Sequence, residues 1–396
     1  MVAMLKRILV AVAVLVVVAA AAFFVLAPGY VERALNPLRM PAEGWPVSNE
    51  AQALHDRLVI GDWHSDALLW DRDILRRADR GHTDVPRLIE GNVAVQVFTT
   101  VTKSPRGQNY DQNSTEAADN ITPLFMGQLR PVRSWFSLRE RALVQAEALA
   151  RAAEQAPDRL RLIRTRGDLQ AVLDERAGGK PVLGALLGSE GGHPLEGDIA
   201  NLDVLHEAGF RLIGLTHFFD NELGGSLHGE GGSGSGLSDF GRQVVQAMID
   251  RGMVIDLAHA SPLMVQDVLA IPEARPILSH TGIHGHCGSA RNLDDDLVRQ
   301  IAAKGGVIGI GFWADVVCGA TPAHVAEAIV AAIDLVGEDH VSLGSDYDGS
   351  VGVPFDAANL AALTQALMDE GLSEDQITKV MGANMIRYLN ETLPEA

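Results

Sequence analysis

The chain alternates short apolar runs with helical stretches, and this alternation restricts its possible folds more than any other feature. The runs are rich in β-branched residues, as expected for buried strands of a parallel sheet. Most gaps between them contain apolar residues at the three- and four-residue spacing of a helix. Eight strands are predicted, at residues 57–62, 93–100, 181–190, 211–217, 253–259, 276–280, 306–312 and 341–346.

Strands that alternate with helices are joined by right-handed parallel crossovers, and eight such units form a closed barrel of ordinary size. The sequence therefore predicts an α/β fold, a (β/α)8 TIM barrel. An open doubly wound sheet is the alternative, but no glycine-rich phosphate loop follows the first predicted strand. Residues 101–180 lie between the second and third strands, and we expect them to form an elaborated crossover rather than a second domain.

The N-terminus carries a segment that is apolar enough to form a transmembrane helix. Lys6 and Arg7 precede an uninterrupted apolar run over residues 8–27, which as a helix at ~1.5 Å per residue matches a bilayer core. We expect residues 1–29 to be an uncleaved anchor, because a signal peptide has a shorter apolar core; the alanines at 19–22 leave cleavage open. With the basic residues inside, the remainder of the chain is exported.

The next segment contains prolines at 37, 41 and 46, which indicate a linker over residues 30–57 and leave residues 58–392 for the barrel domain. The predicted location is the inner membrane, with the barrel in the periplasm. The formal net charge of -19 argues against nucleic acid as a partner, because such binding requires clustered Lys and Arg. Cys287 and Cys318 are equally compatible with one disulfide and with two buried thiols.

Ionisable side chains gather where the predicted strands end, and in such barrels the reacting groups lie at the carboxyl ends of the strands. A single histidine there is ordinarily a hydrogen-bonded structural residue. Several histidines together with several carboxylates indicate a metal site, because unpaired buried charges would be costly. The strand-end residues are His64, Asp66, Glu190, His217, His259, His280 and Asp346. Surface or capping roles are expected for the other histidines, at positions 55, 82, 193, 206, 228, 284, 286, 324 and 340.

Imidazole nitrogens and carboxylate oxygens bind Zn2+ where no thiolate is offered, and three protein ligands leave a position for water. The strand-end donors exceed one such site and suit two ions that share a carboxylate. Two ions about 3.5 to 4 Å apart can lower the pKa of a bridging water and polarise the carbonyl that it attacks. Asp346 and Asp348 are predicted to share a strand face, so either could carry a proton. The role of Asp62 is undecided: it either orients a metal ligand or caps a turn.

Most of these residues lie within longer motifs that occur in a fixed order between about residues 58 and 390. The motifs include DWHSD (62–66), GSEGGHPL (188–195), LTH (215–217), SHTGIHGHCGSARN (279–292) and GSDYDG (344–349). They resemble the motifs of the membrane or renal dipeptidases, peptidase family M19 of the amidohydrolase superfamily, and in particular its bacterial members. The resemblance implies a metallo-dipeptidase with two Zn2+ per subunit, and a homodimer.

The resemblance also implies a role for each metal ligand. His64 and Asp66 would bind one zinc ion and His259 and His280 the other, while Glu190 would bridge both. These five residues therefore form the predicted metal site.

The remaining residues of the motifs would act on the substrate. His217 would contact the substrate carbonyl and stabilise the oxyanion, and Arg291 would hold the C-terminal carboxylate through its planar fork of donors. Asp346 would take a proton from the bridging water and pass it to the leaving amine. Asp348 is predicted to contact the substrate.

The sequence thus predicts a zinc-dependent dipeptidase that hydrolyses small dipeptides, including those with a C-terminal D-residue, through a metal-bridging hydroxide. One alternative is a related amidohydrolase that acts on N-acyl amino acids, lactones or β-lactams. Another is a non-catalytic binding protein that has kept the barrel.

Overall fold

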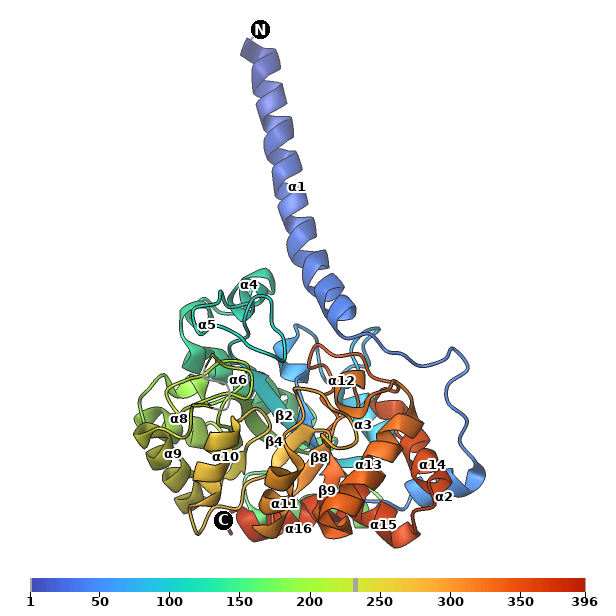
Figure 1. Cartoon of the computed structure of the whole chain (residues 1–396). Coiled ribbons are helices and arrows are strands. Elements are labelled where there is room, and N and C mark those ends of the chain that lie inside the picture. Colours follow the sequence, from blue (N-terminus) through green and yellow to red (C-terminus); the bar gives the residue numbers. More distant parts are fainter. Residues whose placement is uncertain (1, 231–233, 396) are drawn as a thin grey trace.

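The strands predicted from the sequence form a parallel barrel, shown in the computed structural model of Figure 1. The structure describes residues 2–230 and 234–395. The strand order is β6-β5-β4-β2-β1-β9-β8-β7, and a parallel bridge between Asp256 and Ile277 joins the two ends of this series. The predicted (β/α)8 architecture is therefore confirmed.

Each barrel strand overlaps one of the predicted runs. One further strand, β3 (Leu160–Leu162), was not predicted, since three residues are too few to show a period. It pairs with the first part of β4, before β5 pairs with the second part. The barrel strands are β1 (Ile60–Ser65), β2 (Val93–Val101), β4 (Leu183–Glu190), β5 (Phe210–Gly214), β6 (Val254–Asp256), β7 (Leu278–Thr281), β8 (Ile308–Ile310) and β9 (Val341–Leu343).

Helices occupy the crossovers, and many begin at capping residues that the sequence supplies. Ser137 caps α6 through its side chain, and Thr165 and Asp168 form a capping box at the start of α7. The helices are α1 (Val2–Leu35), α2 (Asn49–His55), α3 (Val85–Glu90), α4 (Ile121–Gly127), α5 (Arg133–Phe136), α6 (Leu138–Gln155), α7 (Arg166–Ala177), α8 (Ala200–Glu207), α9 (Asp239–Asp250), α10 (Pro262–Leu269), α11 (Asp295–Ala303), α12 (Ala314–Val317), α13 (Pro322–Val336), α14 (Ala361–Asp369), α15 (Glu374–Thr378) and α16 (Asn384–Thr392).

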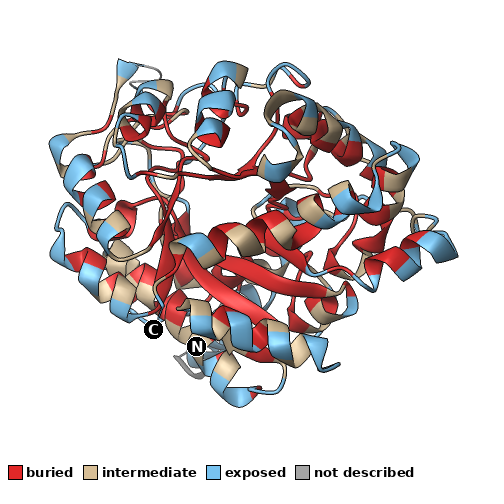
Figure 2. Ribbon diagram, turned by 90° about the horizontal axis from the view of Figure 1, so that it is seen from below, coloured by how far each residue is buried: buried red, intermediate tan, exposed pale blue. Residues whose placement is uncertain are grey.

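The barrel strands are buried on both faces, while the surrounding helices expose their outer sides (Figure 2). Successive side chains of β1 point to opposite faces of the sheet. Trp63 packs edge-to-face on Tyr388 of α16, with ring centroids 5.6 Å apart, in the layer between barrel and helices. The side chains of Asp62 and His64 therefore point into the barrel.

The N-terminal helix α1 continues through Pro28 to Leu35, beyond the predicted end of the anchor at residue 29. Glu32 is 1% exposed and Asn36 is buried, so the first residues of the predicted linker pack against the barrel. Among the described residues, α1 is the one helix that is long and apolar enough to cross a membrane. Its composition and position fit either a membrane anchor or a signal sequence.

Cys287 and Cys318 form a disulfide, which decides between the two alternatives that the sequence left open. The bond joins the loop that follows β7 to the residue that ends α12. Two adjacent crossover loops are thereby tied together beside the barrel.

Candidate active site

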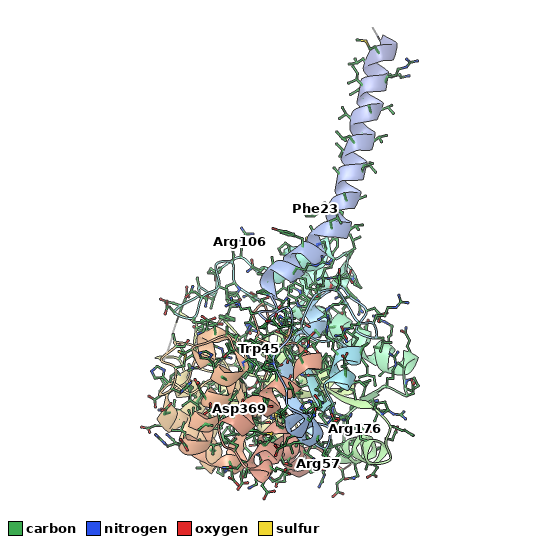
Figure 3. The ribbon with its side chains drawn as sticks, turned by 90° about the vertical axis from the view of Figure 1, so that its right-hand side faces the viewer. Phe23, Trp45, Arg57, Arg106, Arg176 and Asp369 are labelled. Carbon is green, nitrogen blue, oxygen red and sulfur yellow. A yellow bond between two sulfur atoms is a disulfide. The ribbon has the colours of Figure 1, made fainter. Side chains whose placement is uncertain are left out.

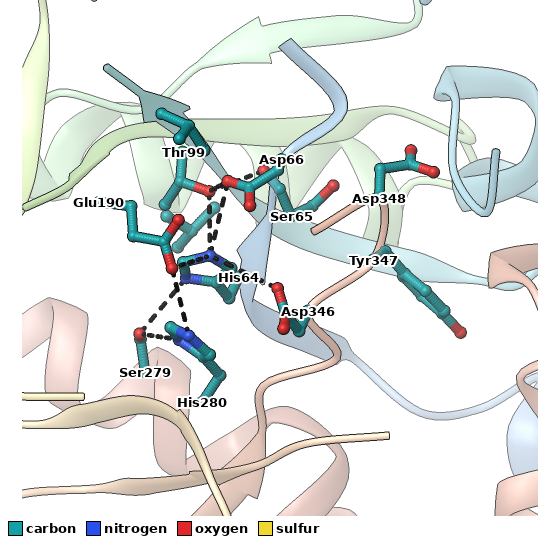
Figure 4. Close-up of polar contacts among 12 residues, drawn as sticks. His64, Ser65, Asp66, Thr99, Glu190, Ser279, His280, Asp346, Tyr347 and Asp348 are labelled. Carbon is teal, nitrogen blue, oxygen red and sulfur yellow. Dashed lines mark hydrogen bonds and ion pairs between the residues drawn. The ribbon is translucent and has the colours of Figure 1, made fainter. Parts of the chain in front are cut away.

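The seven strand-end residues lie together at the carboxyl mouth of the barrel, and all of their side chains are buried. Figure 4 shows how His64, Glu190 and His280 approach one another although they come from three different strands. This convergence follows from the parallel barrel, which places the carboxyl ends of all strands at one rim. The structure thus brings the predicted residues into one cluster.

Glu190 at the end of β4 lies at the centre of the cluster. Its Oε1 atom is 3.1 Å from His259 Nε2, 3.3 Å from His280 Nε2 and 3.5 Å from His64 Nε2. Its other oxygen, Oε2, is 3.2 Å from His217 Nε2. One carboxylate therefore faces four imidazoles, a position from which it can contact two ions.

Among the described residues, three sets of three donor atoms lie close enough to hold a cation, with all atoms of a set within 4.8 Å of one another. The five predicted metal ligands all belong to these sets, together with residues expected to act on the substrate. The division of the ligands between two ions stays a prediction. The sets are Glu190, His217 and His259; His64, Asp66 and Asp346; and His64, Asp256 and His280.

Asp256 is a buried carboxylate of the cluster that sequence reasoning did not single out. Its Oδ1 accepts hydrogen bonds from the backbone amides of Ser279 and Ala258, at 2.9 and 3.0 Å. Its Oδ2 accepts the Ser279 hydroxyl at 2.6 Å, and that hydroxyl lies 2.8 Å from His280 Nδ1. Asp256 therefore orients His280 through Ser279. The sequence feature that could have identified Asp256 is its position as a charged residue inside the apolar run of β6.

Asp62 orients the turn that carries Asp346. Its carboxylate accepts the backbone amide of Ser345 at 2.7 Å and the Ser345 hydroxyl at 2.6 Å. Gly344 lets this turn approach β7, because a Cβ there would overlap the backbone oxygen of Ser279. Of the two roles left open for Asp62, the structure supports orientation of a site residue.

Two carboxylates of the cluster, Glu190 and Asp346, favour the protonated form in the absence of a cation. For Asp66, burial alone would raise the pKa, but the charge of His64 outweighs it and lowers that pKa. Burial raises the pKa of Glu190 well above its ordinary value, and the neighbouring charge of Asp66 raises it further. Burial also raises the pKa of Asp346, to about 8. Burial alone would lower the pKa of His64, but the carboxylates of Glu190 and Asp66 outweigh it and raise that pKa to about 10. The cluster therefore attracts positive charge.

The other imidazoles of the cluster are held neutral. Burial lowers the pKa of His259 and His280 well below the ordinary value, and lowers that of His217 to about 4. Neutral imidazole is the form that binds metal ions. Neutral nitrogen donors beside carboxylates that otherwise collect protons are a suitable environment for divalent cations, so the residues present fit a metal centre.

Arg291 is buried at the edge of the cluster, in the loop after β7. Its Nη1 donates to the backbone oxygen of Ala258 at 2.6 Å and its Nη2 to that of His280 at 2.8 Å. The guanidinium also lines the cavity that leads to the cluster. It can therefore meet a carboxylate inside the cavity, as the resemblance implies.

Asp348 lies apart from the cluster, and the prediction that it shares a strand face with Asp346 was wrong. β9 ends at Leu343, and both aspartates have positive φ angles in the turn that follows, so their side chains diverge (Figure 4). Asp348 pairs with Arg72 and accepts the backbone amide of His82 at 2.6 Å. Asp348 is not among the described residues that line the cavity, and its contact with the substrate stays a prediction.

The expectation of surface or capping roles was also wrong for some histidines outside the cluster, since His55, His82, His193 and His228 are buried. His228 is nearest to the site. Its ring stacks on Phe218 and lies 5.5 Å from the ring of His259 between centroids. A loop histidine gave no periodic signal from which this packing could have been predicted.

A cavity of about 630 Å³ leads from the cluster to the surface. Glu190, His217, His280 and Asp346 line its inner end. This volume is typical of sites that bind small molecules. The buried donors are thus open to a ligand from one side.

A closed parallel barrel with histidines and carboxylates converging at its carboxyl mouth is an arrangement typical of metal-dependent hydrolases. The chain belongs to the membrane dipeptidase family, peptidase family M19, whose model matches residues 48–394. The matched region includes α2 and therefore begins before the predicted domain boundary at residue 58. The protein is accordingly a metallopeptidase of the dipeptidase family.

Similar proteins come from fungi and bacteria. The chain is 28% identical over 354 residues to dipeptidase aclJ of Aspergillus oryzae. The aligned region covers 85% of this chain and 78% of the fungal protein. The probable dipeptidase PvdM of Pseudomonas aeruginosa has the same fold, with a TM-score of 0.71, 19% identity and coverage of 87% and 98% of the two chains. A metallopeptidase from Rhodobacter sphaeroides, liganded with a phosphinate mimic of L-Ala-D-Ala, has a TM-score of 0.68, 24% identity and coverage of 85% and 99%.

Proposed function

We propose that this protein is a zinc-dependent dipeptidase that hydrolyses small dipeptides, including those with a C-terminal D-residue. The observation that carries the proposal is the position of Glu190, whose two oxygens lie within 3.5 Å of four imidazoles at the inner end of an open cavity. A carboxylate in that position suits two cations better than one.

The proposed metal ligands are His64 and Asp66 for one ion and His259 and His280 for the other, with Glu190 shared. Bound zinc would supply Lewis acidity, which polarises a carbonyl and makes a water molecule more acidic. Thr99 supports this assignment, because its hydroxyl donates to Asp66 Oδ1 at 2.6 Å and leaves the other carboxylate oxygen free for an ion.

The neighbouring side chains would position the substrate and move its proton. Arg291 would hold the C-terminal carboxylate of the dipeptide, and His217 would contact the peptide carbonyl and stabilise the oxyanion. Asp346 would accept a proton from the attacking water and give it to the leaving amine.

The proposed setting is the outer side of the inner membrane, with α1 as an uncleaved anchor. Lys6 and Arg7 before the apolar run support this orientation. The ligand of the Rhodobacter sphaeroides relative supports activity on dipeptides that end in a D-residue. Dipeptides released from cell-wall material would be a natural supply at this location.

The test is to purify the full chain in detergent, measure its metal content, and assay a panel of substrates before and after chelation. The panel contains L-Ala-L-Ala, L-Ala-D-Ala, an N-acyl amino acid and a neutral lactone. We expect about two zinc ions per chain, turnover of both dipeptides, and loss of activity on chelation that added zinc restores. Turnover of the N-acyl amino acid or the lactone alone would favour a related amidohydrolase. A metal-free protein without turnover would favour a binding role.

A further inference from the structure

One face of α1 forms the outer wall of the cavity that leads to the cluster. Phe23, Ala27, Val31 and Leu35 all line it, and their spacing of four residues places them in one stripe along the helix. α4 provides the opposite wall, through Ile121, Pro123 and Leu124. The outer part of the cavity is therefore apolar, in contrast to its charged inner end.

A buried ion pair fixes α1 in this position. The carboxylate of Glu32 lies 2.8 Å from Nε of Arg72 and 2.5 Å from Nε of Arg80, and it is shielded from water. One turn further on, Asn36 Oδ1 accepts the backbone amide of Ser350 at 2.8 Å. These contacts hold the helix to the loops that follow β1 and β9, which carry Asp66 and Asp346. The end of the helix is thus part of the mouth of the barrel.

The apolar stripe also places the cavity at the membrane surface. Phe23 and Ala27 belong to the end of the apolar run over residues 8–27, which by length crosses the bilayer core. Figure 3 labels Phe23 where α1 leaves the barrel. The outer part of the cavity would therefore lie at the level of the lipid headgroups.

A second apolar surface lies at the same end of the molecule, at α4 and α5 (Figure 1). Leu129 is 66% exposed, Val132 59% and Phe136 80%. Exposed apolar side chains beside a membrane-crossing helix are well placed to enter the headgroup region. The mouth of the barrel consequently faces the bilayer rather than the aqueous phase.

We propose that the end of the anchor helix is a specificity-determining part of the substrate site, and that the enzyme takes dipeptides with bulky apolar side chains from the membrane surface. This inference rests on the proposed dipeptidase function. The inner end of the cavity would bind the peptide bond and the terminal carboxylate of the dipeptide. The outer, apolar part has the shape and chemistry to bury a large side chain that extends away from the metal centre.

The test compares L-Leu-L-Leu with L-Ala-L-Ala as substrates of the full chain in lipid nanodiscs. The variant Val31→Ser/Leu35→Ser removes apolar contacts from the cavity wall. The matched control is Leu26→Ser/Tyr30→Ser, which has the same spacing at residues that are 68% and 73% exposed and do not line the cavity. We expect the first variant to lower kcat/KM for Leu-Leu, relative to Ala-Ala, by roughly fivefold or more. We expect the control to leave this ratio within about twofold of that of the unmodified protein.

The outcomes separate the inference from the function on which it rests. Turnover of Ala-Ala with equal ratios in both variants would overturn the inference and leave the dipeptidase function standing. Turnover of neither substrate by the unmodified protein would overturn both. An intact mass that shows cleavage near residue 22 in the mature protein would overturn the inference, because the stripe would then lose its anchor. Equal metal content in all variants checks that the barrel is intact.

Discussion

At the scale of single residues, the most informative side chain outside the proposed metal ligands is Arg291. Its guanidinium is buried and already donates to two backbone oxygens, so the loop that carries it is rigidly held beside the cavity. A planar fork held in place can recognise a carboxylate with geometric specificity, which a lysine ammonium cannot reproduce.

We predict that Arg291→Ala lowers kcat/KM for L-Ala-L-Ala by roughly a hundredfold, because removal of one partner from a buried charge pair costs about 2 to 5 kcal/mol. Hydrolysis of the corresponding dipeptide amide, which lacks the carboxylate, should change far less. Steady-state kinetics on the two substrates measures the difference, and Arg291→Lys should restore only part of the activity. An equal loss on both substrates would show that Arg291 acts only through the backbone that it supports.

A second residue-scale prediction concerns protons at the metal centre. His64 and Asp346 have pKa values of about 10 and about 8 without a cation, so these two groups carry protons at pH 7. Zinc must displace these protons, and its apparent affinity should therefore rise as the pH increases from 6 to 8. Calorimetric titration of the metal-free protein in buffers of different ionisation enthalpy should show proton release. A binding enthalpy that is the same in every buffer would contradict this assignment.

At the scale of elements, the crossover loops at the mouth matter more than the strands. The loop after β7 carries Arg291, and the disulfide between Cys287 and Cys318 ties this loop to the next crossover. Such a bond acts mainly by restricting the unfolded chain. It also limits how far this loop beside the cavity can move in the folded protein.

We predict that Cys287→Ser/Cys318→Ser lowers the free energy of unfolding by about 3 to 4 kcal/mol, given the sequence separation of 31 residues between the cysteines. Denaturant unfolding of the variant and the unmodified protein, both in detergent, measures the change. Treatment of the unmodified protein with reductant is the matched control and should give a similar loss. Unchanged stability in both cases would mean that the bond does not restrain the unfolded chain.

At the scale of the whole molecule, the proposed anchor α1 would orient the barrel relative to a membrane. α1 leaves the barrel at its carboxyl mouth, and the exposed apolar residues of the α4–α5 region lie at the same end (Figure 1). If α1 is a membrane anchor, as proposed, this end of the molecule would face the membrane. The implied homodimer would have to keep both subunits in this orientation, and it stays a prediction that light scattering of the solubilised protein can check.

We predict that a fluorophore attached through Phe136→Cys in the full chain is strongly quenched by nitroxide-labelled lipid headgroups in nanodiscs. The control is Arg57→Cys, at an exposed position that Figure 3 shows at the end of the barrel away from α1. Steady-state quenching should be several-fold greater at position 136, because dipolar and contact quenching fall off steeply with distance. Equal quenching at both positions would show that the mouth does not face the bilayer.

The sequence by itself determined the barrel, the helices of its crossovers and the residues at its strand ends. These features are local, because a buried strand shows itself by its apolar run and a helix by its period. The parallel topology then places every strand end at one rim, so His64, Glu190 and His280 could be expected to meet although more than two hundred residues separate the first from the last.

The tertiary structure alone decided which buried polar groups pair with one another. Asp348 follows Asp346 by two residues, yet it pairs with Arg72, 276 positions away in sequence, and Asp256 reaches His280 only through Ser279. Glu32 likewise pairs with Arg72 and Arg80, and these ion pairs hold the end of α1 at the wall of the cavity. A local pattern specifies which face of an element is buried, whereas the partner of a buried charge depends on which distant segments the fold brings within a few ångströms.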